Sequence, residues 1–262
     1  MPILIEACCG CAADVIEAEK GGADRAELNT ALELGGLTPS VGALCAAKEH
    51  ARIPIFVMLR PRAGGFCYDR IDLDTMASDA KALLNAGADG LVFGALKADG
   101  TVDYAACARL LETANNAGKP AVFHRAIDVV PCWQRAFETL MELGFARVLT
   151  SGQARTAPDG ADTIAQMVRF AAEHLQVLPG GGVRLENAAQ LLRRTGCGQI
   201  HLSCRTSLFD QTMPADGPVR FNADSLPPEN VFKRTDRAYF AALKQALSVN
   251  CPPGAGCAGQ DT

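Results

Sequence analysis

The chain has 262 residues, 48% of them hydrophobic and 21% charged, with a net charge of −4. This length and composition predict a globular protein with one large α/β domain or two small ones. The acidic balance and the 6% of aromatic residues disfavour nucleic-acid binding, and the longest apolar runs are too short to span a membrane.

Short apolar runs alternate with helical patterns over about the first 205 residues. Eight runs predict strands, at 3–8, 24–29, 55–60, 90–96, 121–126, 147–150, 176–178 and 199–203. The first helix is predicted around 15–18 and stops at Gly21-Gly22, and the second starts at Thr38-Pro39-Ser40, a capping hydroxyl followed by proline. The other helices are predicted at 76–85, 104–114, 132–143, 163–174 and 185–194.

Eight strands in regular alternation with helices predict an α/β fold, a (β/α)₈ TIM-like barrel. The alternative, a doubly wound open sheet, usually carries Gly-x-Gly-x-x-Gly after its first strand, where this chain has Cys8-Cys9-Gly10-Cys11. Beyond Thr206 the pattern breaks into a loop, followed by one extra C-terminal helix at 236–247. We therefore expect a single domain over 1–249 and a flexible, disordered tail at 250–262.

Charged and hydrogen-bonding residues gather at the carboxyl ends of the predicted strands. Alternation with period two places Glu6 with Cys8, and Glu27 with Arg25, on a common face of their strands. His124 and Asp128 share a face if the extended geometry continues that far. Because parallel strand ends meet at one mouth of a barrel, Glu6, Glu27, His124 and Asp128 are candidate acids and bases. Ion pairs that plug the barrel mouth are the alternative interpretation.

A glycine-rich segment, Gly180-Gly181-Gly182, follows the seventh strand and indicates an anion site, because phosphate sites commonly form after strands seven and eight. A tight turn is the alternative. Further candidate ligand-binding residues are Arg25, Arg60, Ser151 and His201. The pattern favours a small anionic ligand, and no organic cofactor is predicted.

Eleven cysteines are present, an odd number that includes the adjacent pair Cys8-Cys9. Without a recognisable signal peptide, this disfavours a disulfide framework and indicates a reducing, cytoplasmic setting. Cys8, Cys9 and Cys11 are candidate metal ligands, since thiolates select Cu(I) or zinc. Taken alone, the set is more typical of structural cysteines, because no zinc-finger spacing recurs.

Together, several blocks of sequence resemble the CutC copper homeostasis family, a family distinct from the choline-cleaving glycyl-radical enzyme of that name. The blocks are 5–8, 22–28, 35–40, 60–62 with 66–68, 123–128, 146–152, 179–183, His201 and 220–222. The resemblance implies a TIM-like barrel, a cytosolic location, a homodimer and copper(I) binding. It also implies that Cys8 pairs with a second cysteine at the end of the second strand, where this chain has Asn29.

Two functions remain open at this point. The resemblance implies a cytosolic copper homeostasis protein that binds copper(I) through Cys8. The residues themselves indicate a TIM-barrel enzyme acting on a small phosphate- or carboxylate-bearing metabolite through acid and base groups at the barrel mouth.

Overall fold

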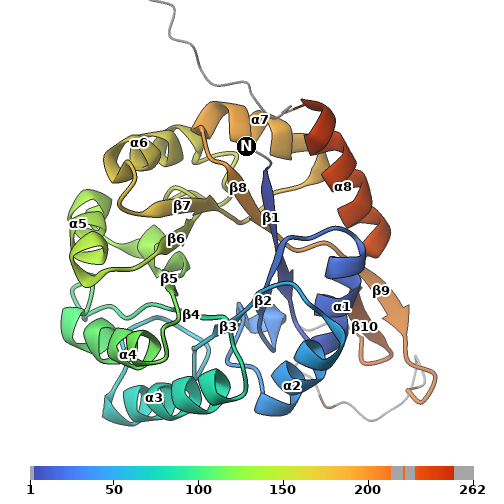
Figure 1. Ribbon diagram of the computed structural model, residues 1–262, viewed down its shortest axis with the longest axis horizontal. Coiled ribbons are helices and arrows are strands. Elements are labelled where there is room, and N and C mark those ends of the chain that lie inside the picture. Colours follow the sequence, from blue (N-terminus) through green and yellow to red (C-terminus); the bar gives the residue numbers. More distant parts are fainter. Residues whose placement is uncertain (1–2, 214–220, 222–227, 251–262) are drawn as a thin grey trace, which may run out of the picture.

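The computed structural model describes residues 3–213, 221 and 228–250. Eight parallel strands alternate with helices and form a ring (Figure 1). The strands pair in the order β7-β6-β5-β4-β3-β2-β1-β8, and a parallel bridge between Gly180 and His201 joins β7 to β8. The predicted (β/α)₈ barrel is confirmed, and the open doubly wound sheet is excluded.

The elements lie close to their predicted positions. The barrel strands are β1 (Leu4–Cys9), β2 (Arg25–Leu28), β3 (Ile55–Met58), β4 (Gly90–Phe93), β5 (Ala121–Phe123), β6 (Arg147–Thr150), β7 (Gln176–Pro179) and β8 (Gln199–Leu202). The helices are α1 (Ala12–Lys20), α2 (Val41–His50), α3 (Arg70–Asn85), α4 (Tyr104–Asn116), α5 (Trp133–Leu143), α6 (Ala161–Ala171), α7 (Leu185–Thr195) and α8 (Arg237–Asn250). Short 3₁₀ helices are η1 (Leu32–Leu34) and η2 (Arg125–Val129).

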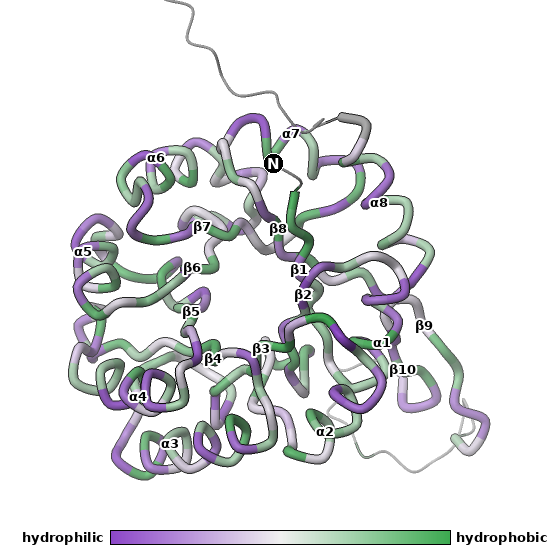
Figure 2. The backbone as a smooth tube through the Cα atoms, in the orientation of Figure 1, coloured by the Kyte–Doolittle hydropathy of each residue, from purple (hydrophilic) through white to green (hydrophobic). Residues whose placement is uncertain are grey.

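The strands bury side chains on both faces. Outward residues such as Ile5, Ala7 and Cys9 join the large core shared with the helices. A smaller apolar cluster fills part of the barrel interior, formed by Phe56, Met58, Val92, Val122, Leu149 and Leu178. Around the ring, the helices alternate hydrophilic and hydrophobic segments (Figure 2), as expected of helices with one face against the strands.

Two local predictions are corrected. The side chain that caps α2 is Ser40, whose Oγ accepts from the amide of Ala43, while Thr38 Oγ1 accepts from the amide of Arg60. The fifth strand ends at Phe123 and turns into η2, so Asp128 does not continue the extended geometry from His124.

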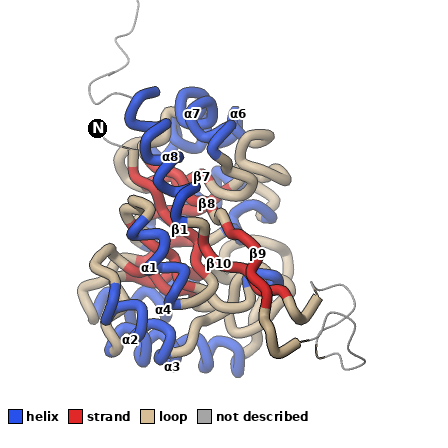
Figure 3. The backbone as a smooth tube through the Cα atoms, turned by 90° about the vertical axis from the view of Figure 1, so that its right-hand side faces the viewer, coloured by secondary structure: helices blue, strands red, loops and turns tan. Residues whose placement is uncertain are grey.

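The chain after β8 differs most from expectation. Strands β9 (Arg205–Phe209) and β10 (Val231–Thr235) form an antiparallel hairpin in place of the predicted loop. The hairpin stands off the ring of helices, on the side away from the N-terminus (Figure 3). Helix α8, expected as an addition, contacts α7 and α1 and serves as the eighth helix of the barrel. The predicted flexible tail lies, from residue 251 on, outside the described residues.

Among the described helices, none combines the length and hydropathy needed to cross a bilayer.

Candidate functional site at the carboxyl ends of the strands

A cavity of about 790 Å³ opens at the carboxyl ends of the strands, and we call it the main cavity. Eight of the residues predicted from the sequence line it: Cys8, Glu27, Arg60, His124, Asp128, Gly181, Gly182 and His201. The other predicted residues, Glu6, Arg25, Ser151, Gly180, Cys9 and Cys11, are not part of its lining.

Glu6 and Arg25 belong to a buried ionic layer beneath the main cavity. Glu6 forms an ion pair with Arg25 Nε, and its Oε1 lies 2.8 Å from His201 Nδ1. Arg147 Nη1 lies 3.9 Å from the other carboxylate oxygen. Burial alone would raise the pKa of Glu6, but the hydrogen bond from His201 and the charges of Arg25 and Arg147 lower it to about 2. Glu6 therefore stays a fully partnered carboxylate at neutral pH, as the ion-pair interpretation of the strand ends described.

Arg147 is the member of this layer that sequence reasoning missed. Its guanidinium lies 5.4 Å from the ring centroid of Phe56, and that of Arg25 lies 5.5 Å from the same centroid. Burial and the neighbouring Arg25 lower the pKa of Arg147 to about 10. The sequence did contain a signal, because Arg147 lies two residues before the inward-facing Leu149 on β6 and therefore shares its face of the strand.

Cys8, Glu27 and His201 form a cluster at the inner end of the main cavity. One ligand atom from each lies within 4.8 Å of the other two. Burial raises the pKa of the Cys8 thiol and of the Glu27 carboxyl. Burial alone would lower the pKa of His201, but the charge of Glu27 and hydrogen bonds with Cys8 and Glu6 hold it well above its usual value.

Asn29 completes this cluster from the end of β2. Its Nδ2 donates to Glu27 Oε1 at 3.0 Å and lies 3.9 Å from Cys8 Sγ. Glu27 Oε2, in contrast, is buried without a partner in the described structure. Position 29 therefore faces Cys8, and Glu27 offers one unused oxygen atom.

The three predicted cysteine ligands are not brought together. Cys9 points away from Cys8 into the core between strands and helices, and burial raises the pKa of its thiol well above the usual value. Cys11 precedes α1 and lines two smaller cavities outside the barrel mouth. Adjacent strand residues face opposite sides, so only Cys8 can act inside the barrel.

His124 is a buried imidazole with one nitrogen unused. Its Nδ1 accepts from the amide of Ala126 at 3.3 Å, which assigns the proton to Nε2, and Nε2 has no partner within the described residues. The ring packs against Phe66, with 4.8 Å between centroids. Burial and the nearby charge of Arg60 lower the pKa of His124 to about 3. His124 is therefore a neutral hydrogen-bond donor at the wall of the main cavity.

Arg60 connects two loops at the mouth. Its Nη1 donates to the carbonyls of Leu34 and Gly36, at 3.0 and 3.1 Å, and its Nη2 donates to the carbonyl of Gly64 at 2.6 Å. The remaining nitrogen, Nε, is buried without a partner in the described part of the chain. For the predicted anion-binding role, Arg60 therefore offers the unpartnered Nε and a positive charge without an ion pair among the described residues.

Asp128 and Ser151 are committed to the structure of the rim. Asp128 accepts hydrogen bonds from Thr150 Oγ1, from the amides of Ser151 and Gln153, from Ser151 Oγ and from Arg125 Nε. Ser151 is buried, and its hydroxyl also contacts Arg125 and the carbonyl of Ala154. Neither side chain retains a free position of the kind a catalytic base needs.

The glycine segment has two parts. Gly180 continues the end of β7, where an added Cβ would lie 2.5 Å from Leu149 Cδ1. Gly181 and Gly182 adopt left-handed φ values of 94° and 71° and face the main cavity. Arg125 Nη1 would lie 3.0 Å from a Cβ on Gly181. Gly180 is therefore required by packing inside the barrel, and Gly182 by its φ value and by Thr156, whose Cβ would lie 2.8 Å from an added Cβ.

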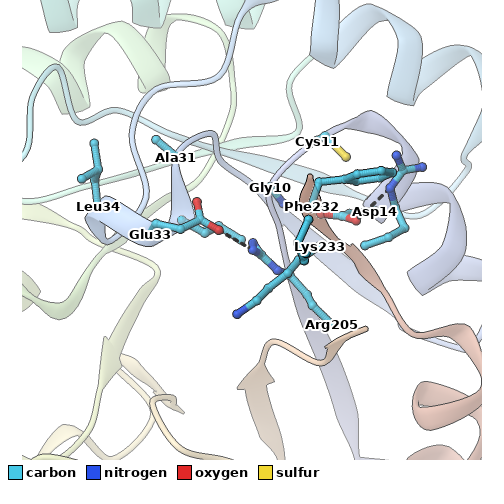
Figure 4. A pocket seen from close by; sticks show the side chains of 12 residues that line it. Gly10, Cys11, Asp14, Ala31, Glu33, Leu34, Arg205, Phe232 and Lys233 are labelled. Atoms are coloured by element: carbon cyan, nitrogen blue, oxygen red, sulfur yellow. Dashed lines mark hydrogen bonds and ion pairs between the residues drawn. The ribbon is translucent and has the colours of Figure 1, made fainter. Parts of the chain in front are cut away.

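The hairpin of β9 and β10 contributes residues to the mouth of the main cavity that no sequence motif predicted. Arg205 Nη2 of β9 lies 2.6 Å from Glu33 Oε1 of η1. Figure 4 marks this ion pair with a dashed line. This ion pair borders both the main cavity and a neighbouring cavity of about 490 Å³, and Lys233 of β10 lines both as well. At the base of the hairpin, the buried Asp14 accepts from the amide of Thr235 at 2.8 Å.

Comparison with known proteins gives a consistent result. The model of the CutC family matches residues 3–206. A family protein CutC from Treponema denticola is 46% identical over 87% of this chain and 92% of its own length. The human copper homeostasis protein cutC homolog is 41% identical over 89% of this chain and 85% of its own length.

Solved structures agree at the level of the fold. A copper homeostasis protein CutC from Streptococcus agalactiae superposes with a TM-score of 0.72 at 33% identity, covering 76% of this chain and 97% of that one. Thiamine phosphate pyrophosphorylase from Pyrococcus furiosus superposes with a TM-score of 0.56 at 15% identity, covering 95% and 97%. The second likeness shows the fold alone.

Proposed function

We propose, from the premise that the chain belongs to the CutC family, that this protein takes part in copper homeostasis and binds Cu(I) at Cys8. One observation carries the proposal: Cys8, Glu27 and His201 come from three neighbouring strands, and their ligand atoms lie within 4.8 Å of one another. Sulfur and imidazole nitrogen are donors that suit a soft cation such as Cu(I).

The cluster has about the dimensions of a metal site. Metal–sulfur and metal–nitrogen bonds of about 2.0–2.3 Å place two ligands of one ion at most about 4.6 Å apart. His201 is also oriented for this role, because Glu6 binds its Nδ1 and leaves the other ring nitrogen for a metal ion. A carboxylate behind a metal-binding histidine is a common supporting arrangement.

Binding of Cu(I) at this cluster displaces protons. The thiol of Cys8 must ionise and His201 must become neutral before either can act as a ligand. Because the pKa values of both groups are raised, the affinity for Cu(I) decreases as the pH falls.

Anaerobic titration of Cu(I) against a chromophoric chelator tests the proposal. We expect one tightly bound ion in the wild-type protein and its loss in Cys8→Ser, with an intermediate affinity in His201→Gln. Cys45→Ser removes an exposed thiol remote from the cluster and is the matched control, with wild-type binding expected. Tight binding that survives in Cys8→Ser would contradict the proposed site.

A second function is favoured by a separate observation. Glu27 Oε2, Arg60 Nε and His124 Nε2 are all buried without a partner among the described residues, and the three residues that carry them line the main cavity. Buried polar atoms are rarely left unpaired, so these three atoms favour a polar ligand. Glu27, with its raised pKa, suits proton transfer, and neutral His124 suits polarisation of a carbonyl oxygen. The second proposed function is acid–base catalysis on a small anionic metabolite.

Thermal unfolding in the presence of metabolite mixtures tests this second function. We expect stabilisation by an anionic component in the wild-type protein, lost in Glu27→Gln although that variant folds. Glu112→Gln, on the exposed surface of α4, is the matched control and should retain the stabilisation. If no metabolite stabilises the protein and Cu(I) binds tightly, the enzymatic function is refuted.

A further inference from the structure

We infer that the main cavity binds a small molecule with two anionic groups, one on Arg60 and His124 and the other on Gly181, Gly182 and Arg184. The inference rests on the second proposed function and specifies its ligand: a compact molecule that carries a carboxylate or enolate oxygen at one end and a phosphate group at the other.

The first subsite is a pair of free N–H donors. Both side chains contact Phe66, because its ring centroid lies 4.8 Å from that of His124 and 5.4 Å from Arg60 Cζ. Arg60 is 7% and His124 3% exposed, and each keeps one nitrogen without a partner in the described structure. Two such donors, one of them charged, suit a carboxylate or an oxyanion.

An uncompensated cation strengthens this assignment. Arg60 is buried, and its hydrogen bonds go to backbone carbonyls, so no carboxylate neutralises its charge within the described residues. Taking a charge out of water without a counterion is costly. An anionic ligand group at Nε would remove that cost, which a neutral ligand would not do.

The second subsite is the turn after β7. Within the described residues, no hydrogen bond uses the amides of Gly181 and Gly182, and both residues of this turn have left-handed φ values. Such a turn holds phosphate oxygens. Arg125 Nη1 would lie 3.0 Å from a Cβ on Gly181, and Arg184, two residues after Gly182, is the N-cap residue of α7.

The charges around the main cavity have the matching sign. Arg125 pairs with Asp128, and Arg205 pairs with Glu33. Arg60, Arg184 and Lys233 line the cavity without an ion pair in the described part of the chain, against the single unpaired carboxylate of Glu27. The mouth therefore carries an excess of positive charge that attracts an anion.

Isothermal titration with 2-phosphoglycolate, which carries both groups, tests the inference against inorganic phosphate and glycolate, which carry one each. We expect 2-phosphoglycolate to bind at least tenfold more tightly than either. Arg184→Gln should lower the affinity for phosphate and the affinity for 2-phosphoglycolate by a similar factor. Arg193→Gln, the control, also removes one positive charge, but in the last turn of α7 and away from the cavity. It should leave both affinities unchanged.

His124→Phe separates the subsites, because it removes the Nε2 donor and keeps an aromatic ring on Phe66. We expect it to abolish the preference for 2-phosphoglycolate over phosphate and to leave phosphate binding unchanged, whereas His124→Gln, which restores a donor, should recover part of the preference. Equal affinity of the wild-type protein for 2-phosphoglycolate and phosphate would overturn the inference, as would equal effects of Arg184→Gln and Arg193→Gln. If none of the three probes binds while a metabolite mixture still stabilises the protein, the inference fails and the second proposed function stands; if no probe binds and no mixture stabilises the protein, both fail.

Discussion

Replacement of His124 by phenylalanine should make the stability of this protein less sensitive to acid. Burial and the charge of Arg60 lower the pKa of His124 from 6.5 to about 3. Below pH 6.5 the imidazole therefore takes up a proton in the unfolded chain and stays neutral in the folded one. The unfolded state binds more protons throughout this window, so the free energy of unfolding falls as the pH falls from about 6.5 toward 3.

The size of the effect follows from the width of that window. For each unit of pH below 6.5, the free energy of unfolding falls by about 1.4 kcal/mol, because the unfolded state binds one proton more than the folded state. At pH 5 the loss is therefore about 2 kcal/mol, and it is small at pH 7. His201, whose pKa shifts in the opposite direction, is present in both proteins and cancels from their difference.

Urea unfolding of the wild-type and His124→Phe proteins at pH 7 and pH 5 measures this difference. Between pH 7 and pH 5, the free energy of unfolding should fall by about 2 kcal/mol more in the wild-type protein than in the variant. His50→Phe removes an exposed ring, 60% accessible, and should keep the wild-type pH dependence. Nitrogen NMR of the imidazole gives an independent reading, with a neutral ring protonated on Nε2 expected at pH 5. A ring that titrates near pH 6.5, or a proton on Nδ1, would refute the reasoning.

Three further substitutions have defined outcomes. Asn29→Cys places a second thiol toward Cys8, where Nδ2 now lies 3.9 Å from Sγ; chelator competition should show Cu(I) affinity raised at least about tenfold. Gly94→Ala puts a Cβ 2.8 Å from His124 Nδ1 in a buried site, and urea unfolding should show a loss of about 1–3 kcal/mol. Asp128→Asn places an amide NH₂ group opposite hydrogen-bond donors of Thr150 and Ser151 and removes the ion pair with Arg125. The free energy of unfolding should therefore fall by about 2–4 kcal/mol. Asp99→Asn, on an exposed loop, is the control and should change it little.

Most of the barrel could be predicted because its strands are buried on both faces and read as apolar runs with charged ends. The hairpin could not. In β9, Arg205 is half-buried and the following four residues are exposed, so the sequence has no alternation of buried and exposed positions to detect. The turn into η2 was missed for a related reason, because Ala126 and Ile127 are both buried and continue the apolar pattern of β5 after the strand has ended.

Glu6 and Glu27 show why the candidate site was only partly predictable. Alternation with period two tells which face of a strand a side chain occupies, and it placed both carboxylates inside the barrel. It does not tell how far along the barrel axis each carboxylate lies, because that position depends on the register between strands. In the structure Glu6 stands opposite Arg25 and His201, while Glu27 stands opposite Cys8, one layer nearer the mouth. Because of this difference of one layer, Glu6 lies among cationic side chains, and these lower its pKa to about 2. Glu27 keeps one unpaired oxygen atom, and burial raises its pKa. In the second proposed function, proton transfer is therefore assigned to Glu27, and Glu6, hydrogen-bonded to His201 Nδ1, is assigned the orientation of that ring.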